Sequence, residues 1–243
     1  MIKIIYRACD LVNSVHGGSH CRPMNLSKKD IISISSLSLK DCLKDIQHEF
    51  YIIGDRVSEQ TKLSLIENLN PKNVYFHTNE LGNMGVFLES SKLAMTFDDN
   101  DIIFFAEDDY LYDSSVFYTR LKDFIDFADL NISLPWFIHP TDYPDQYSHF
   151  LSRNYIHQTK SGYWREVSHT TGSFICYKKY YKMFNTFIDE CYLNRSADQG
   201  MSSLFKDKAL CYSPIPSIGT HLHLGTMPEY VNWNSLILKY LIK

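Results

Sequence analysis

Short apolar runs alternate with amphipathic segments over the first 110 residues of the chain. Three runs are rich in β-branched or aromatic residues and each meets charge at its end: "IKIIY" at 2–6, "EFYIIGD" at 49–55 and "DIIFFAED" at 101–108. Such runs are typical of strands buried on both faces of a sheet. The helices expected between them cover 27–43, 59–69 and 83–95. Alternating strands and helices predict an α/β fold with a parallel sheet.

The second half of the chain has a less regular pattern. A helix is expected over 115–129, and a long loop over 133–150, where proline and aromatic residues are frequent. The remaining expected elements are a strand at 172–177, a helix at 178–193, a helix beginning at 196 and a strand at 217–224. Ligands of open α/β sheets bind beyond the carboxyl ends of the strands. We therefore expect the charged strand ends to share one rim.

Length, charge and cysteine usage narrow the class of protein. The 243 residues, 44% of them hydrophobic, suit one domain over 1–243. A net charge of -4, with 24 basic and 28 acidic residues, argues against duplex nucleic acid as a partner. Six irregularly spaced cysteines indicate reduced thiols.

The chain shows no obvious membrane or export signal. No apolar run is long enough to span a bilayer, and the start "MIKIIYRACD" lacks the features of a signal peptide. We expect a cytoplasmic protein without a transmembrane segment. The amphipathic segment 228–243 is expected to pack on the core, with peripheral membrane contact as the alternative.

Three consecutive acids, Glu107, Asp108 and Asp109, follow the apolar run at 102–106. Carboxylates are costly to bury at the end of a strand unless a cation compensates them. Hard oxygen ligands suit Mg²⁺ or Mn²⁺, which also bridge the phosphates of nucleotides. A solvated turn is the alternative, and the local string by itself favours that turn.

The acidic string resembles the DxD element of GT-A fold glycosyltransferases, and its surroundings resemble that superfamily over nearly the whole chain. The resemblance implies a single GT-A (Rossmann-like) domain with a mostly parallel sheet flanked by helices. Residues 1–113 would form the nucleotide-binding half, and 114–243 the acceptor-binding and catalytic half. Glu107 and Asp108 would face ribose and metal, and Asp109 would bind the metal. Glu in place of the first Asp departs from the pattern and leaves its contact open.

Further segments resemble nucleotide-sugar-binding elements of the same superfamily. "YRACD" resembles the end of the first strand, where the base is met, which implies contacts from Arg7 and Cys9. "IIGDRVSE" resembles the second strand with its base-reading acid, here Asp55. "LGNMGVF" resembles the turn that opens the helix before the DxD strand, which would place Asn83 near the base or ribose. Each segment alone also fits a turn, a surface charge or a helix cap, and the order of the segments supports the resemblance.

The second half offers a candidate base and candidate metal ligands. "SADQGMSSLF" resembles the helix start that carries the catalytic acid of inverting members, which implies that Asp198 accepts the proton of the acceptor hydroxyl. A favourable charge near a helix N-terminus is the alternative for Asp198. "GTHLH" resembles the C-terminal His that completes the metal site. His221 and His223 project to the same side of a strand, and His221 is the preferred ligand.

Four residues are candidates for contact with the donor sugar or the acceptor. His139 and Asp142 lie in the loop rich in proline and aromatic residues, and Trp136 and Trp164 could stack on a sugar ring. Packing in the core is the alternative for both tryptophans.

The sequence thus predicts a metal-dependent, inverting glycosyltransferase that uses Mn²⁺ or Mg²⁺. A UDP-sugar is the favoured donor, and the acceptor is a glycan or another hydroxyl-bearing molecule, with a modified nucleobase left open. A retaining glycosyltransferase, a nucleotidyltransferase and a non-catalytic sugar-binding domain are the alternatives. A nucleotidyltransferase has a Gly-rich basic loop after its first strand, which Gly17, Gly18 and Arg22 imitate only faintly.

Overall fold

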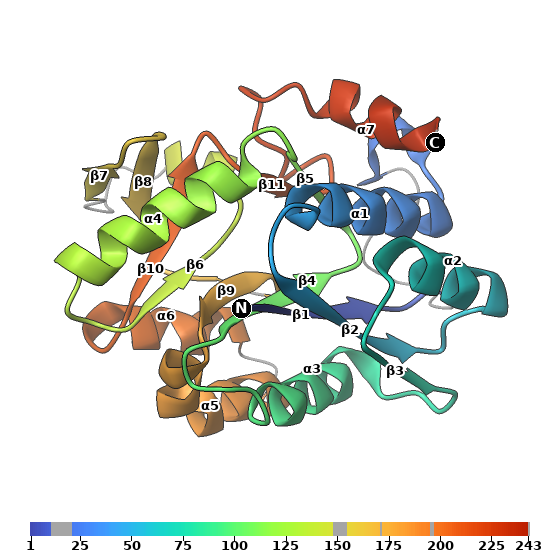
Figure 1. Ribbon diagram of the computed structural model, residues 1–243, viewed down its shortest axis with the longest axis horizontal. Helices are drawn as coiled ribbons and strands as arrows, with labels where there is room; N and C mark the ends of the chain where they lie inside the picture. Colours follow the sequence, from blue (N-terminus) through green and yellow to red (C-terminus); the bar gives the residue numbers. More distant parts are fainter. Residues whose placement is uncertain (11–20, 148–154, 171, 195–196, 243) are drawn as a thin grey trace.

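The computed structural model describes residues 1–10, 21–147, 155–170, 172–194 and 197–242, except for the side chains of residues 198 and 199. Within these ranges the chain forms one nine-stranded sheet and one two-stranded sheet. Helices cover both faces of the larger sheet, which gives three layers (Figure 1). The predicted α/β fold class is therefore confirmed.

The first half of the chain supplies four parallel strands, three of which match the expected runs. β1 (Ile2–Ala8) pairs with β2 (His48–Asp55) and with β4 (Ile102–Glu107). β3 (Asn73–His77), which was not predicted, pairs with β2. The intervening helices are α1 (Lys28–Leu43), α2 (Glu59–Leu69) and α3 (Gly82–Ala94).

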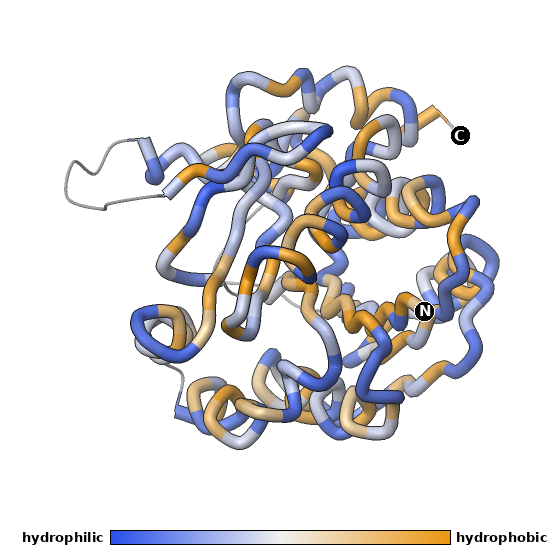
Figure 2. Tube along the Cα trace, turned by 60° about the vertical axis from the view of Figure 1, so that its left-hand side comes forward, coloured by the Kyte–Doolittle hydropathy of each residue, from blue (hydrophilic) through white to orange (hydrophobic). Residues whose placement is uncertain are grey.

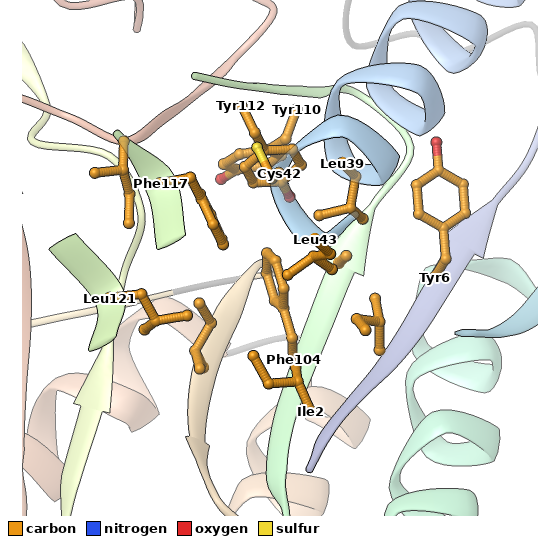
Figure 3. Close-up of a cluster of buried hydrophobic side chains, with 14 of the residues drawn as sticks. Ile2, Tyr6, Leu39, Cys42, Leu43, Phe104, Tyr110, Tyr112, Phe117 and Leu121 are labelled. Carbon is orange, nitrogen blue, oxygen red and sulfur yellow. The ribbon is translucent and has the colours of Figure 1, made fainter. Parts of the chain in front are cut away.

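These strands are buried on both faces, because successive side chains point to opposite faces of a sheet. Ile4 and Tyr6 of β1 belong to the core beneath α1 and α2, whereas Ile5 belongs to the core beneath α3. Figure 3 shows part of the first core, in which the labelled side chains include Leu39 and Leu43 of α1 and Phe104 of β4. Figure 2 shows the same pattern along the chain, with apolar segments gathered inside and polar segments outside.

The second half extends the sheet with mixed pairing. β9 (Phe174–Tyr177) runs antiparallel to both β4 and β6 (Trp136–Ile138). β10 (Leu210–Ile215) is parallel to β6 and antiparallel to β8 (Tyr163–Glu166), which pairs with β7 (Ile156–Gln158). The strand order is β3-β2-β1-β4-β9-β6-β10-β8-β7. A parallel half and a mixed half thus share one sheet.

The helices of the second half complete the two outer layers. On one face, α4 (Phe117–Asn131) and α7 (Trp233–Leu241) pack with α1. On the other face, α5 (Lys178–Leu193) packs with α3 and with α6 (Ala197–Asp207). Short 3-10 helices cover Pro23–Asn25 and Pro144–Tyr147. In the parts of the chain that the structure describes, no helix is both long and apolar enough to cross a membrane.

Two expected elements differ from the observed ones. The predicted loop at 133–150 contains β6, whose buried residues pair with strands on both sides. The predicted strand at 217–224 ends early: β11 (Gly219–His221) pairs with β5 (Tyr110–Tyr112), and the chain then turns. At this turn the amide of His223 donates to the carbonyl of His221 at 2.8 Å. Both differences arise from pairing between segments that are distant in sequence.

Candidate active site

A pocket of about 330 Å³ lies at the carboxyl ends of β1, β2 and β4. Parallel neighbouring strands end at the same edge of a sheet, so their terminal side chains and following loops converge there. The residues that line the pocket include Arg7, Cys9, Asp55, Asn83, Glu107, Asp108 and Asp109. The structure therefore brings together all six residues predicted to bind the nucleotide-sugar and the predicted carboxylate ligand of the metal.

Glu107, the last residue of β4, pairs with Arg7 on the neighbouring strand. Nη2 of Arg7 lies 3.0 Å from Oε1 of Glu107 and also donates to the carbonyl of Gly172 at 2.7 Å. The two strands are in register at these residues, so the ion pair follows directly from parallel pairing. Gly172 adopts φ +60°, and a Cβ there would overlap the carboxylate of Glu107. Only glycine fits this close approach without displacing that carboxylate.

Asp108 is fully engaged by protein groups. Its Oδ1 lies 2.6 Å from Nζ of Lys28, and its Oδ2 accepts a hydrogen bond from the backbone amide of Cys9 at 2.8 Å. Its side chain is 10% exposed. Asp108 thus anchors Lys28 and the end of β1. Its expected contact with ribose and metal stays a prediction.

Asp109 faces the imidazole of His221. Oδ2 of Asp109 lies 3.2 Å from Nε2 of His221, and each side chain is 31% exposed. The pairing of β5 with β11 holds the two residues together, and the amide of Leu222 donates to the carbonyl of Asp109 at 2.7 Å. Oδ1 of Asp109 is buried and makes no hydrogen bond to the residues that the structure describes. A buried carboxylate oxygen without a donor is suited to a cation.

The three acids differ in how firmly they hold their charge. Burial raises the pKa of Glu107 and of Asp108 above their usual ranges. Burial also acts to raise the pKa of Asp109, but the neighbouring charges of His221 and Lys28 outweigh it and hold that pKa well below its usual range. Asp109 is therefore the acid that is held ionised, and a cation bound by Asp109 and His221 together would require His221 to release its proton.

The residues present fit a divalent cation for which the protein supplies only some of the ligands. Asp109 supplies a free carboxylate oxygen, and His221 supplies an imidazole nitrogen of the kind that Mn²⁺ accepts. Among the described residues, no group of three or more His, Cys, Asp and Glu side chains forms a metal site by itself. Mg²⁺ and similar ions are commonly held by one or two protein ligands together with substrate phosphates. A site with these two ligands suits that mode of binding.

His223 lies beside His221, on the side of the chain that was expected. The two rings stack with centroids 5.8 Å apart, and the Nδ1 of His223 accepts from the amide of Gly225 at 3.3 Å. The ring of Tyr110 also stacks on that of His221, with the two ring centroids 5.4 Å apart. Of the two imidazoles, His221 is the one in contact with Asp109.

Asp55 and Asn83 meet where β2 ends and α3 begins. The carboxylate of Asp55 accepts from the amides of Leu81 and Gly82, each at 3.1 Å. It therefore satisfies donors at the N-terminus of α3, and Asn83 follows in the first turn of that helix. Both residues line the pocket.

Four predicted contact residues lie in the interior. Trp136 and Trp164 are fully buried, and both pack on Phe124, so neither ring can stack on a sugar from solvent. Asp142 is fully buried, and its carboxylate contacts Arg165 and two tyrosine hydroxyls. His139 is also buried, and its Nδ1 lies 2.8 Å from the hydroxyl of Thr170. The aromatic core alternative is therefore correct for both tryptophans.

Asp198 lies in the first turn of α6, but its side chain is outside the described residues. Gly17 and Gly18 of the faint glycine-rich loop are outside them as well. Sequence reasoning missed Lys28 and Gly172. The helix start predicted at residue 27 placed Lys28 at the beginning of a helix. Only tertiary packing shows which acid the lysine contacts.

No protein-family model and no curated protein sequence matches this chain. Among solved structures, S. aureus TarS 1-349 is similar with a TM-score of 0.50 and 12% identity, over 87% of this chain and 59% of that one. A galactosyltransferase, LgtC, solved with donor and acceptor sugar analogs, has a TM-score of 0.47 and 13% identity over 86% and 72%. The inositol-1-phosphate CTP transferase from T. maritima has a TM-score of 0.45 and 14% sequence identity, over 99% of this chain and 96% of that one. With the strand order above, the likeness to TarS confirms the expected GT-A-type fold.

Proposed function

We propose that this chain is a metal-dependent glycosyltransferase that moves a sugar from a nucleotide-diphosphate donor, with a UDP-sugar favoured, to an acceptor hydroxyl. The observation that carries the proposal is the contact between Asp109 and His221 at the edge of the pocket, with one oxygen of Asp109 left without a donor. In this proposal residues 1–113 bind the donor, and 114–243 bind the acceptor and carry out catalysis.

The metal would be held by Asp109 and His221, and it would neutralise charge on the diphosphate as that group leaves. The rest of the pocket serves the nucleotide. Arg7 keeps a positive charge beside it, and Asp55 orders the first turn of α3, against which a base or ribose can rest. Mn²⁺ is favoured over Mg²⁺, because one of the two protein ligands is an imidazole.

Sugar transfer needs a base for the acceptor. In the proposed inverting reaction, Asp198 accepts the proton of the acceptor hydroxyl as its oxygen bonds to the anomeric carbon. The bond from that carbon to the diphosphate oxygen breaks on the opposite face, and the nucleotide diphosphate departs with the electron pair. The assignment of Asp198 rests on its place in the sequence, at the start of α6.

Calorimetric titration of UDP with and without Mn²⁺ tests the donor site. We expect Mn²⁺ to tighten UDP binding to the wild-type chain by about tenfold or more, and Asp109→Asn to abolish this gain because it removes one ligand charge. Asp126→Asn is a matched control, since Asp126 is an exposed residue of α4 that pairs with Lys122. Equal Mn²⁺-dependent affinity in the Asp109 and wild-type proteins would overturn the metal assignment.

Product analysis separates the proposed reaction from its alternatives. Release of UDP from a UDP-sugar, with the anomeric configuration of the product inverted by NMR, is the expected result. Retained configuration would replace inversion by a retaining reaction. Release of pyrophosphate from a nucleoside triphosphate would indicate a nucleotidyltransferase. Nucleotide-sugar binding without turnover in the presence of Mn²⁺ and a panel of glycans would favour a sugar-binding domain.

A further inference from the structure

The ammonium group of Lys28 lies between two of the three acids at the pocket. Its Nζ is 2.6 Å from Oδ1 of Asp108 and 3.9 Å from Oδ2 of Asp109. Both acids line the pocket, and Lys28, which is not itself a lining residue, contacts the pocket through Asp108. The side chain of Lys28 is 25% exposed, which leaves part of it open to solvent and to a ligand.

The position of Lys28 is set by the backbone around it. Lys28 is the first residue of α1, which follows a capping box formed by Ser27 and Asp30. The amide of Asp30 donates to Oγ of Ser27 at 3.2 Å, and the amide of Ser27 donates back to Oδ2 of Asp30 at 3.0 Å. About two turns further along α1, the hydroxyl of Ser35 donates to the carbonyl of Glu107 at 3.3 Å. These contacts fix α1, and with it Lys28, relative to the end of β4.

Lys28 uses only part of its bonding capacity. An ammonium group has three donors, and within the described residues Lys28 makes one hydrogen bond, to Asp108. At 3.9 Å, Asp109 attracts the ammonium but is too distant for a hydrogen bond. Asp108, in turn, is occupied by Lys28 and by the amide of Cys9. Asp108 therefore holds the cation in place and leaves donors of Lys28 for another anion.

We propose that Lys28 is a phosphate-binding residue that donates to an oxygen of the donor's diphosphate, next to the cation at Asp109. The proposal rests on the function proposed above. A diphosphate carries more negative charge than one divalent ion with Asp109 as a ligand can balance, and a fixed ammonium group adds the missing charge. Lysine binds phosphate as a point charge and does not require the planar geometry of arginine. As the diphosphate leaves, the same charge stabilises it.

Comparison of UDP with uridine isolates the contribution of the phosphates. In the presence of Mn²⁺, Lys28→Gln is expected to weaken UDP binding by about tenfold or more and to change uridine binding less than about twofold, because uridine has no phosphate. Lys28→Arg keeps the charge and is expected to recover most of the UDP affinity. Lys29→Gln is the matched control, since the neighbouring Lys29 bonds to Gln60 on α2. Its UDP affinity is expected to equal that of the wild type.

A second variant separates phosphate binding from a purely structural role. Lys28→Gln leaves Asp108 buried without its cation, which could by itself distort the pocket. The double variant with Lys28→Gln and Asp108→Asn removes both charges and keeps an amide pair in their place. We expect the double variant to regain thermal stability and still bind UDP about tenfold more weakly than the wild type. Recovery of full UDP affinity in the double variant would show that Lys28 only neutralises Asp108 and would overturn the proposal.

The same titrations distinguish failure of this proposal from failure of the proposed function. If the wild type binds UDP tightly in a Mn²⁺-dependent manner and Lys28→Gln binds it equally well, Lys28 does not bind the phosphates. The proposed donor site would then remain supported. Absence of UDP binding by the wild type, with inorganic pyrophosphate and Mn²⁺ also failing to bind, overturns both.

Discussion

Nε2 of His221 lies 3.2 Å from Oδ2 of Asp109, so an imidazole from the last part of the chain meets a carboxylate from its middle. The short antiparallel pairing of β11 with β5 creates this contact, with His221 opposite Tyr110, the residue after Asp109. The ring of Tyr110 stacks on His221 and limits its rotation. The two candidate metal ligands are thus positioned by the backbone before any ligand arrives.

His221 and His223 are expected to differ in their effects on Mn²⁺ binding. His221→Ala should weaken Mn²⁺-dependent UDP binding by about tenfold or more, because it removes one of two protein ligands. His223→Ala, which removes the ring stacked on His221, should weaken it by less than about threefold. Titration of Mn²⁺ at saturating UDP measures both. A larger loss from His223→Ala than from His221→Ala would assign the ligand to the other ring.

Asp198→Asn is expected to slow catalysis without affecting the donor. Loss of a general base lowers the rate by about 10²- to 10⁴-fold, whereas an uncharged amide of the same size leaves UDP binding within about twofold. Release of UDP from a UDP-sugar measures the rate, and calorimetry measures the affinity. A normal rate of UDP release would exclude Asp198 as the base.

Gly172→Ala should displace the side chain of Glu107, which lines the pocket. The new Cβ would overlap the carboxylate of Glu107 at a backbone φ of +60°, so Glu107 must move away from Arg7 or the turn must change. We expect weaker UDP binding and a loss of stability of about 1 kcal/mol or more. At Gly225 an added Cβ meets its nearest neighbours, two ring atoms of His223, at 3.6 Å, an ordinary contact. Gly225→Ala is therefore the control, and an equal effect in both variants would contradict the predicted overlap.

Glu49, near the start of β2 and away from the pocket, should make the stability of the fold depend on pH. Hydrogen bonds from Lys3, Lys72 and Tyr51 lower the pKa of Glu49 to about 2. A folded-state pKa below the unfolded-state value near 4.5 stabilises the fold above that pH, and the contribution is lost as the pH falls toward 2. Allowing for solvent screening, Glu49→Gln should lower the free energy of unfolding at pH 7 by about 1 kcal/mol.

Urea unfolding of the wild type and the Glu49→Gln variant at pH 7, 4 and 2.5 measures this difference. The gap between the two proteins should narrow steadily toward the lowest pH. Glu67→Gln, at an exposed position of α2, should show no such dependence. A gap that stays constant from pH 7 to 2.5 would contradict the depressed pKa.

Local pattern was sufficient for the first half of the fold. The apolar runs that became β1, β2 and β4 are continuous and end in charge, and parallel pairing then brings Arg7, Asp55 and Glu107 to one edge. β3 escaped prediction because its residues are largely exposed and its apolar run is only three residues long. β6 escaped because its three residues lie in a short segment flanked by Pro135 and Pro140, which looks like a loop until pairing with β9 and β10 buries it.

The site was predicted in part for the same reason. The resemblance of the acidic string and of "GTHLH" to GT-A elements predicted Asp109 and His221, but the sequence could not show that Lys28 pairs with Asp108. The sequence also could not show that Trp136 and Trp164 face the core beneath α4. Aromatic residues occur both in cores and in clefts that bind sugars, so residue type alone does not distinguish the two.

By itself the sequence determined β1, β2 and β4 and the place of their charged ends, since strand period and strand ends are local properties. Tertiary structure alone decided which basic side chain each acid faces: Arg7 for Glu107, Lys28 for Asp108 and His221 for Asp109. The physical reason is that electrostatic pairing depends on distances of a few ångströms between segments far apart in the chain. Only the packing of α1, β5 and β11 around the sheet sets those distances.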